Sequence, residues 1–181
     1  MNKLLLGVAA CCAVGLSAGA WAADAATADE VVSKVKEAAT AVKASSADVV
    51  LSEFDKKDGK WAWKDTYVFV LDCEHGVVKA HPSEKVKGIK VTELKDKATG
   101  QEFGTALCNA AKSTHGGWVE YMWQKPGAGR LSRKVSYALA ADVSFAAGIQ
   151  VSAGVYDESI PIAELGKVLE KMSDPAKYPA L

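Results

Sequence analysis

The hydrophobic pattern of the chain changes its period near residue 59, and this change limits the fold more than any other feature. Before it, apolar residues recur at helical spacing, namely Val31, Val35, Ala38 and Val42, as on the buried face of an amphipathic helix. After it, the segment Thr66-Tyr67-Val68-Phe69-Val70-Leu71 is rich in β-branched and aromatic residues, which favour strands. A chain that begins with helix and continues with strands predicts an α+β domain whose helices cover an antiparallel sheet.

The limits of the elements follow from capping and turn residues. Thr27-Ala28-Asp29-Glu30 has the pattern of a capping box, which predicts a helix starting there and running to about Ala44. A second helix is expected from about Ala47 to Phe54, before a turn at Asp55-Lys56-Lys57-Asp58-Gly59. Strands are expected at 66–71, 77–81, 118–123, 133–141 and 145–156, and short or further helices near 91–99, 101–113 and 162–171.

The first 22 residues have the pattern of a secretory signal peptide. Lys3 is followed by an apolar stretch from Leu4 to Leu16, which is shorter than the roughly 20 residues that a spanning helix needs. Ala20-Trp21-Ala22 then provides a cleavage signal, with Ala18-Gly19-Ala20 as the alternative. Val8-Ala9-Ala10-Cys11 resembles a lipoprotein box, but the apolar run continues well past Cys11. We therefore expect cleavage and export to the periplasm.

The mature chain, residues 23–181, is expected to form a single domain that does not span a membrane. Its length suits one domain with a substantial core. The full chain has 22 basic and 22 acidic residues and a formal net charge of zero. No basic surface is therefore expected to attract nucleic acid.

Two cysteines, Cys73 and Cys108, remain after the signal peptide. In an oxidising compartment an even number of cysteines favours a disulfide. Two unpaired thiols, or a metal site formed with His75, are the alternatives. The spacing matches no established zinc, haem or thiol redox motif, so we expect the disulfide and no metal or cofactor.

Several separated motifs together resemble a single Cache domain. The first part of the resemblance is the run from Trp63 to Asp72, followed by Gly76, Ala80-His81-Pro82 and Gly88. The second is Gly116-Gly117-Trp118-Val119-Glu120-Tyr121-Met122-Trp123, followed by Lys134-Val135-Ser136-Tyr137 and Ala153-Gly154-Val155-Tyr156. The resemblance covers roughly residues 29 to 157.

This resemblance implies a PAS-like antiparallel sheet with a long N-terminal helix and a pocket on one face of the sheet. Cache domains are extracytoplasmic sensor modules, and the ligands of single Cache domains are typically small organic acids. The expected function is therefore binding or sensing of a small molecule, with a carboxylate favoured, by a domain without its own output region. The alternative is an accessory subunit that docks on a membrane receptor or kinase and binds no small molecule.

Five residues are candidates for ligand binding. Lys134 would supply a cation for a carboxylate, and Tyr137 a hydroxyl from the same family motif. Tyr121 and Trp123 share one face of their strand, because side chains alternate, and would form an aromatic wall. His81 would donate from the end of a hairpin. Each has a structural alternative: a solvated lysine, ordinary sheet core, or a histidine that caps a turn.

Catalysis finds no support in the sequence. The nucleophile elbow, the zinc-protease motif and the phosphate-binding loop are all missing from it. The three histidines and the carboxylates show no spacing that would pair them as acid and base. We therefore expect a binding protein rather than an enzyme.

Overall fold

The structure is a computed structural model that describes residues 24–44, 47–97, 99–141, 148–157, 159–164 and 167. The expected signal peptide, residues 1–22, lies outside the described residues. So does most of the helix expected at 162–171, of which only 162–164 and 167 are described as helical.

Two helices open the fold, and both have the expected limits. Helix α1 spans Ala28–Ala44, and helix α2 spans Ala47–Phe54. The capping box forms in both directions: the Thr27 amide donates to Glu30 Oε2 at 2.9 Å, and the Glu30 amide donates to Thr27 Oγ1 at 3.3 Å. The apolar positions of α1 are buried as the helical period requires.

Five antiparallel strands form the main sheet, in the order β4-β3-β7-β6-β5. Their limits are Phe69–Asp72 (β3), Val77–Ala80 (β4), Gly117–Gln124 (β5), Leu131–Ala140 (β6) and Ile149–Val155 (β7). A separate two-stranded sheet pairs β1 (Ala62–Trp63) with β2 (Thr66–Tyr67). A 3-10 helix, η1 (Val91–Glu93), and helix α3 (Phe103–Ala110) connect β4 to β5.

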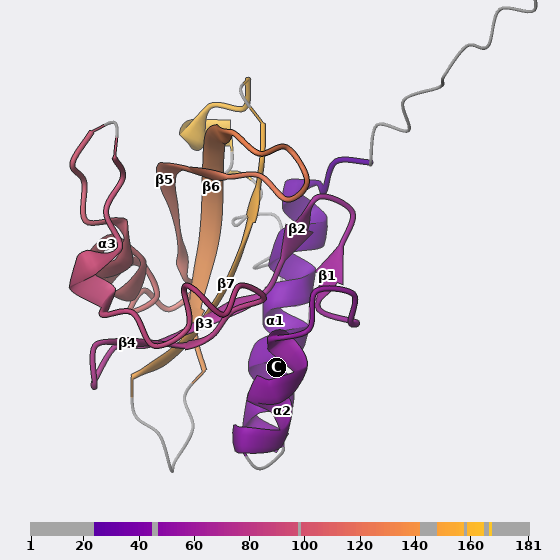
Figure 1. Cartoon of the computed structure of the whole chain (residues 1–181), viewed down its shortest axis with the longest axis vertical. Helices are drawn as coiled ribbons and strands as arrows, with labels where there is room; N and C mark the ends of the chain where they lie inside the picture. The colour runs from indigo at the N-terminus through magenta and orange to yellow at the C-terminus, as the bar shows by residue number, and fades with distance from the viewer. Residues whose placement is uncertain are drawn as a thin grey trace, which may run out of the picture.

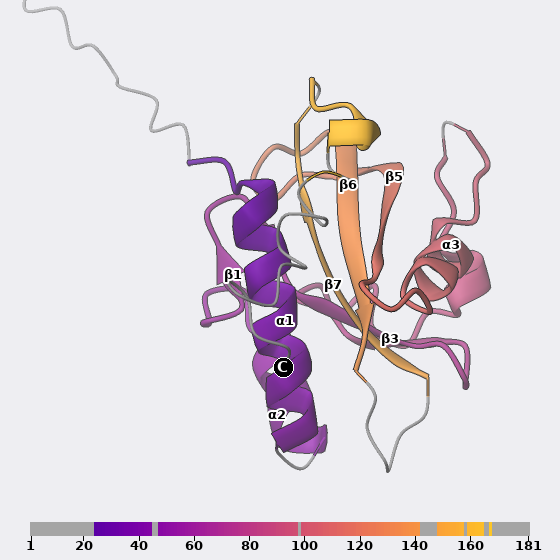
Figure 2. The ribbon, with the colours of Figure 1, turned by 180° about the vertical axis from the view of Figure 1, so that it is seen from behind.

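The sheet separates two layers of helix. Figures 1 and 2 show α1 and α2 along one face and α3 on the other. Each strand contributes alternate side chains to the two faces. The α1-side core contains Val70, Val135, Tyr137, Val151, Ala153 and Val155. The α3-side core contains Phe69, Leu71, Phe103, Leu107, Val119 and Tyr121.

The observed elements confirm the α+β class and a long N-terminal helix on an antiparallel sheet. Several limits differ. The helical element expected at 91–99 is a 3-10 helix over Val91–Glu93 only, the helix expected at 101–113 is Phe103–Ala110, and residues 145–147 of the strand expected at 145–156 lie outside the described residues. The strand expected at 66–71 is divided at Val68 into β2 and β3. The Val68 amide donates to the Trp61 carbonyl at 2.8 Å, outside the main sheet. The chain therefore leaves the small sheet and enters the main one at this residue.

Candidate functional site

The amine of Lys134 is surrounded by aromatic rings on the α3 side of the sheet. Lys134 lies in β6 opposite Tyr121 of β5, and only 1% of it is exposed. Its Nζ lies 4.1 Å from the ring centroid of Tyr67, 5.0 Å from that of Phe69 and 5.1 Å from that of Tyr156. We call these three rings the aromatic box. An ammonium group over ring faces is attracted by their quadrupoles, so the box favours this position of the amine.

A glycine in the neighbouring strand makes room for the Lys134 side chain. A Cβ placed on Gly154 of β7 would lie 2.8 Å from Lys134 Cε and 2.5 Å from Ser136 Oγ. Both separations are shorter than real Cβ contacts. The lysine side chain therefore lies against β7 because residue 154 has no side chain.

The charge of Lys134 is poorly compensated by the protein. Burial lowers the pKa of its amine to about 7, while the negative charge of Asp65 acts in the opposite direction. Within the part of the chain that the structure describes, no carboxylate forms an ion pair with this amine. Asp65 itself pairs with Lys125, whose Nζ lies 2.9 Å from Asp65 Oδ2. The site therefore has a buried cation and suits an anion that would bring the missing charge.

His81 adds a neutral hydrogen-bond donor beside this cation. The Ser83 amide donates to His81 Nδ1 at 2.9 Å, and because a backbone N–H only donates, the ring proton resides on Nε2. Burial, together with the nearby charge of Lys134, lowers the pKa of His81 to about 3. The ring is therefore uncharged near neutral pH. It lies edge-on to Tyr67, with the ring centroids 4.9 Å apart.

Two cavities meet at these residues. The outer cavity has a volume of about 440 Å³ and includes Trp63, Lys64 and Lys125 in its lining. The inner cavity, of about 10 Å³, includes Phe69, Tyr121 and Lys134. Four residues line both, namely Tyr67, His81, Val86 and Trp123. We call these four the shared wall.

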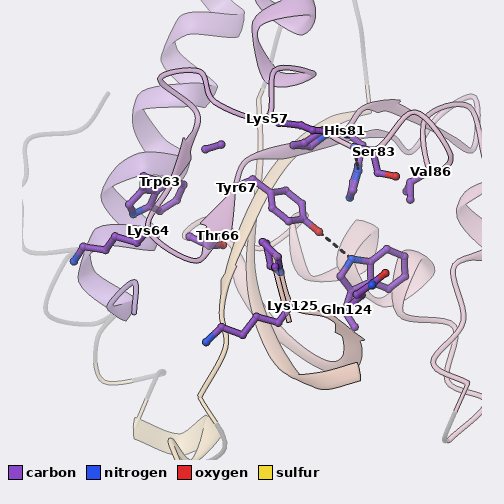
Figure 3. Close-up of a pocket in the computed structure, with 15 residues that line it drawn as sticks. Lys57, Trp63, Lys64, Thr66, Tyr67, His81, Ser83, Val86, Gln124 and Lys125 are labelled. Carbon is purple, nitrogen blue, oxygen red and sulfur yellow. Dashed lines mark hydrogen bonds between the residues drawn. The ribbon is translucent and has the colours of Figure 1, made fainter. Parts of the chain in front are cut away.

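The shared wall is held by a hydrogen bond. Trp123 Nε1 donates to Tyr67 Oη at 2.9 Å, and Figure 3 shows this bond from the labelled Tyr67, with His81, Ser83 and Val86 close by. Trp63 and Lys64 lie on the other side of Tyr67 in the same view, and Lys125 lies below it. Lys134 lines the inner cavity and not the outer one, so the shared wall lies between its side chain and the larger outer cavity.

Comparisons with known proteins identify the family. The sequence profile described as "Single Cache domain 2" matches residues 23–161. The chain belongs to the single Cache domain family. Among curated protein sequences, the comparison found no significant match.

Three solved structures share the fold of this Cache domain. A methyl-accepting chemotaxis protein from Vibrio parahaemolyticus is 19% identical with a TM-score of 0.57, over 73% of this chain and 89% of the other. A Cache chemosensory domain, described in connection with carboxylic acid recognition, is 24% identical with a TM-score of 0.52 over 70% and 86%. The periplasmic sensor domain of a chemotaxis protein is 21% identical with a TM-score of 0.53 over 70% and 88%.

Membership in this family supports part of the functional expectation. Cache domains are sensory modules, and single Cache domains are typically extracellular or periplasmic. A sensory role agrees with the expectation of a binding domain rather than an enzyme. No described helix is long and apolar enough to cross a membrane.

Four of the five candidate residues of this Cache domain come together. Lys134, Tyr121, Trp123 and His81 all line the inner cavity. Tyr121 stacks on Phe103 of α3, with centroids 4.0 Å apart and ring planes within 3°, and its hydroxyl lies 2.8 Å from Ser136 Oγ. Trp123 and His81 belong to the shared wall.

Tyr137 does not join the other candidates. Its ring is buried in the α1-side core, where it packs against Trp118 with centroids 5.4 Å apart. Its hydroxyl donates to the His115 carbonyl at 2.6 Å. Residues three apart on one strand point to opposite faces, so Tyr137 cannot share the face of Lys134. The family motif placed them together in sequence, but the pleat separates them.

Sequence reasoning missed the residues that make the aromatic box. The sequence places Tyr67 and Phe69 in an expected strand and all three residues in motifs of the family resemblance, but it gives none of them a part in the site. The signal was available in part, because Tyr67 and Phe69 are two residues apart and so share a face. The alternation along one strand does not reveal that β3 and β6 both pair with β7. This pairing brings the aromatic box around Lys134.

The two cysteines are bonded in the structure. The Cys73 and Cys108 sulfurs are 2.03 Å apart, which joins the end of β3 to α3. The bonded sulfurs are not available as metal ligands, and His75 instead has Nδ1 2.9 Å from Asp72 Oδ2. Among the described residues, no group of three potential metal ligands is found.

Proposed function

We propose that this Cache domain binds a small organic carboxylate in the periplasm and that the Lys134 amine is its main partner. The single observation that supports the proposal most directly is the burial of this amine without a carboxylate partner among the described residues. Keeping a cation in this position has a free-energy cost, and an anionic ligand would offset it.

The neighbouring donors fit the same ligand. A carboxylate has two oxygens that accept several hydrogen bonds. The Lys134 ammonium, the His81 Nε2–H and the Trp123 Nε1–H are donors from three different segments, and all three residues line the inner cavity. A hydrogen bond between charged partners is worth about 1.5–3 kcal/mol, so Lys134 would dominate the affinity. The relative described in connection with carboxylic acid recognition shares the fold.

A second candidate function is docking on a membrane receptor or kinase without a small ligand. The observation that favours it is the small volume of the inner cavity, about 10 Å³, which shows that the protein's own side chains fill this space. Under this alternative Lys134 would be a structural group held by the aromatic box.

The proposal is tested by a thermal-shift screen followed by calorimetry. Carboxylates are compared with their uncharged amides, for example acetate with acetamide and phenylacetate with phenylacetamide. A ligand at 100 times its dissociation constant stabilises by about 2.7 kcal/mol, which corresponds to a midpoint shift of about 5–11 °C for a domain of this size. We expect shifts with acids and none with amides.

Two lysine variants separate specific binding from general charge attraction. Lys134→Met removes the buried amine but keeps an unbranched apolar side chain, whereas Lys79→Met changes an exposed lysine of β4. We expect the first to lose binding and the second to retain it. If no acid binds the wild-type protein, or if both variants bind as it does, the proposal is wrong, and a pull-down of membrane partners would test docking.

A further inference from the structure

We propose that the outer cavity receives a flat aromatic body, so that the ligand is an aryl-bearing carboxylic acid rather than an acid of two or three carbons. This inference rests on the proposed function, because it assigns a class to the same ligand. Its starting point is the contrast between the two cavities, about 440 Å³ outside the shared wall and about 10 Å³ inside it.

The volumes exclude a ligand that lies wholly inside. The inner cavity holds at most one water. An acid of two or three carbons has several times the volume of one water. It would overfill the inner cavity and occupy only a small part of the outer one. A volume of 440 Å³ lies within the range of pockets that bind larger organic molecules, about 300–1,000 Å³.

The lining of the outer cavity favours a ring. Most of its apolar residues are aromatic or cyclic, namely Trp63, Tyr67, Trp123, Pro82 and Pro126, and Ala62 and Val86 are the aliphatic ones. Aromatic rings pair with one another in offset-stacked or edge-to-face arrangements that add to the gain from burial. A flat ligand body can form such pairs, whereas a flexible alkyl chain gains burial alone and also loses rotational freedom.

The positions of the hydrogen-bond donors orient the ligand. The His81 donor and the Trp123 N–H lie in the shared wall, and Lys134 lies behind it. The Trp123 N–H is occupied by the Tyr67 hydroxyl. A carboxylate that replaces this hydroxyl as the acceptor opens the wall toward Lys134. The ring of the ligand then remains in the outer cavity.

The outer rim has the charge needed to attract such an acid. Three lysines line the outer cavity, namely Lys57, Lys64 and Lys125. Two of them are partly compensated, because Lys64 pairs with Glu30 at 2.7 Å and Lys125 with Asp65 at 2.9 Å. The rim therefore attracts anions without containing a strong second site, which suits an acid with one carboxylate rather than two.

The test compares three acids by calorimetry on the purified wild-type protein. Acetate supplies the carboxylate alone, hexanoate adds an alkyl body, and phenylacetate adds a ring of similar size. We expect phenylacetate to bind at least about tenfold more tightly than either of the others, from the burial of its ring and its contacts with the aromatic lining.

A pair of tryptophan variants locates the ring. Trp63→Ala removes a ring from the outer cavity, and Trp118→Ala removes a half-buried tryptophan that packs on the α1-side core away from both cavities. We expect Trp63→Ala to reduce the ratio of phenylacetate to acetate affinity about three- to tenfold. Trp118→Ala should leave this ratio unchanged.

The outcomes distinguish the two proposals. If none of the three acids binds, the proposed function itself fails. If acetate or hexanoate binds as tightly as phenylacetate, the carboxylate function stands and the aromatic assignment is overturned. An unchanged affinity ratio in Trp63→Ala would overturn the placement of the ring in the outer cavity.

Discussion

Carboxylate binding should take up a proton above neutral pH, because the amine of Lys134 is largely neutral there before the ligand arrives. Burial lowers the pKa of this amine to about 7. A carboxylate beside it favours the ammonium form and would raise its pKa again. The experiment therefore measures the binding of a carboxylic acid at pH 6, 7 and 8 at constant ionic strength. The acid is chosen so that it stays ionised over this range.

The magnitude follows from the fraction of amine that is protonated before binding. With a pKa of about 7, this fraction is about nine tenths at pH 6, one half at pH 7 and one tenth at pH 8. If only the ammonium form binds, the affinity falls about tenfold from pH 6 to pH 8. The number of protons taken up per ligand rises from about 0.1 to about 0.9 over the same range.

The other titratable groups around Lys134 do not change charge in this window. His81 has a pKa lowered to about 3 by burial and by the charge of Lys134. Tyr67 has a pKa raised to about 12 by burial, and burial also raises the pKa of the Tyr121 and Tyr156 hydroxyls. These groups stay neutral between pH 6 and pH 8, so the dependence belongs to Lys134.

Calorimetry in two buffers with different ionisation enthalpies measures the proton uptake directly. At pH 8 the observed binding enthalpy should differ between the buffers, and at pH 6 the difference should nearly vanish. The amide of the same acid serves as the control, since it should show no linked proton. An affinity that is constant from pH 6 to pH 8, or protons released rather than taken up, would refute the assignment of Lys134.

Three further predictions concern the stability of the fold. Since the Lys134 amine binds its proton more weakly in the folded chain than in the unfolded one, wild-type stability falls as pH decreases from about 10 to 7. The Lys134→Met variant should lose this pH dependence. At pH 6 its free energy of unfolding in urea should exceed that of the wild-type protein by about 1–3 kcal/mol, a figure that already allows for the lost cation–π contacts. Reduction of the disulfide between Cys73 and Cys108 should lower the free energy of unfolding by about 3–4 kcal/mol. Urea unfolding with and without reductant measures this difference. Gly154→Ala should destabilise by about 1–3 kcal/mol because its Cβ would contact Ser136 Oγ and Lys134 Cε, and an unchanged thermal midpoint would contradict that packing.

Local patterns in the sequence predict the helices and most strands. The capping box at Thr27 and Glu30 sets the start of α1 through contacts between neighbouring residues. The limits expected for α2 agree with those observed. The division of the strand at Val68 was missed because its cause, a hydrogen bond to Trp61, belongs to the packing of the small sheet.

The site was predictable only where alternation along one strand decides the geometry. Tyr121 and Trp123 share a face for this reason. The same rule places Tyr137 on the opposite face from Lys134, although the family motif groups them. The position of Gly154 beneath the lysine depends on which strands are neighbours. The order β3-β7-β6 is set by long-range packing, which no local pattern contains.

The place of β7 in the sheet has a consequence for how the protein is made. β7 lies between β3 and β6, and Phe69 of β3 pairs with Ser152, which comes 83 residues later in the sequence. Until Ile149–Val155 has been synthesised, β3 and β4 have no neighbour on that side and the α1-side core lacks its central strand. A nascent chain that has not yet reached Val155 lacks the strand that joins the two halves of the main sheet. For a protein that we propose to be exported in extended form, a central strand that follows all of its neighbours in the sequence would keep the sheet incomplete until Ile149–Val155 has emerged.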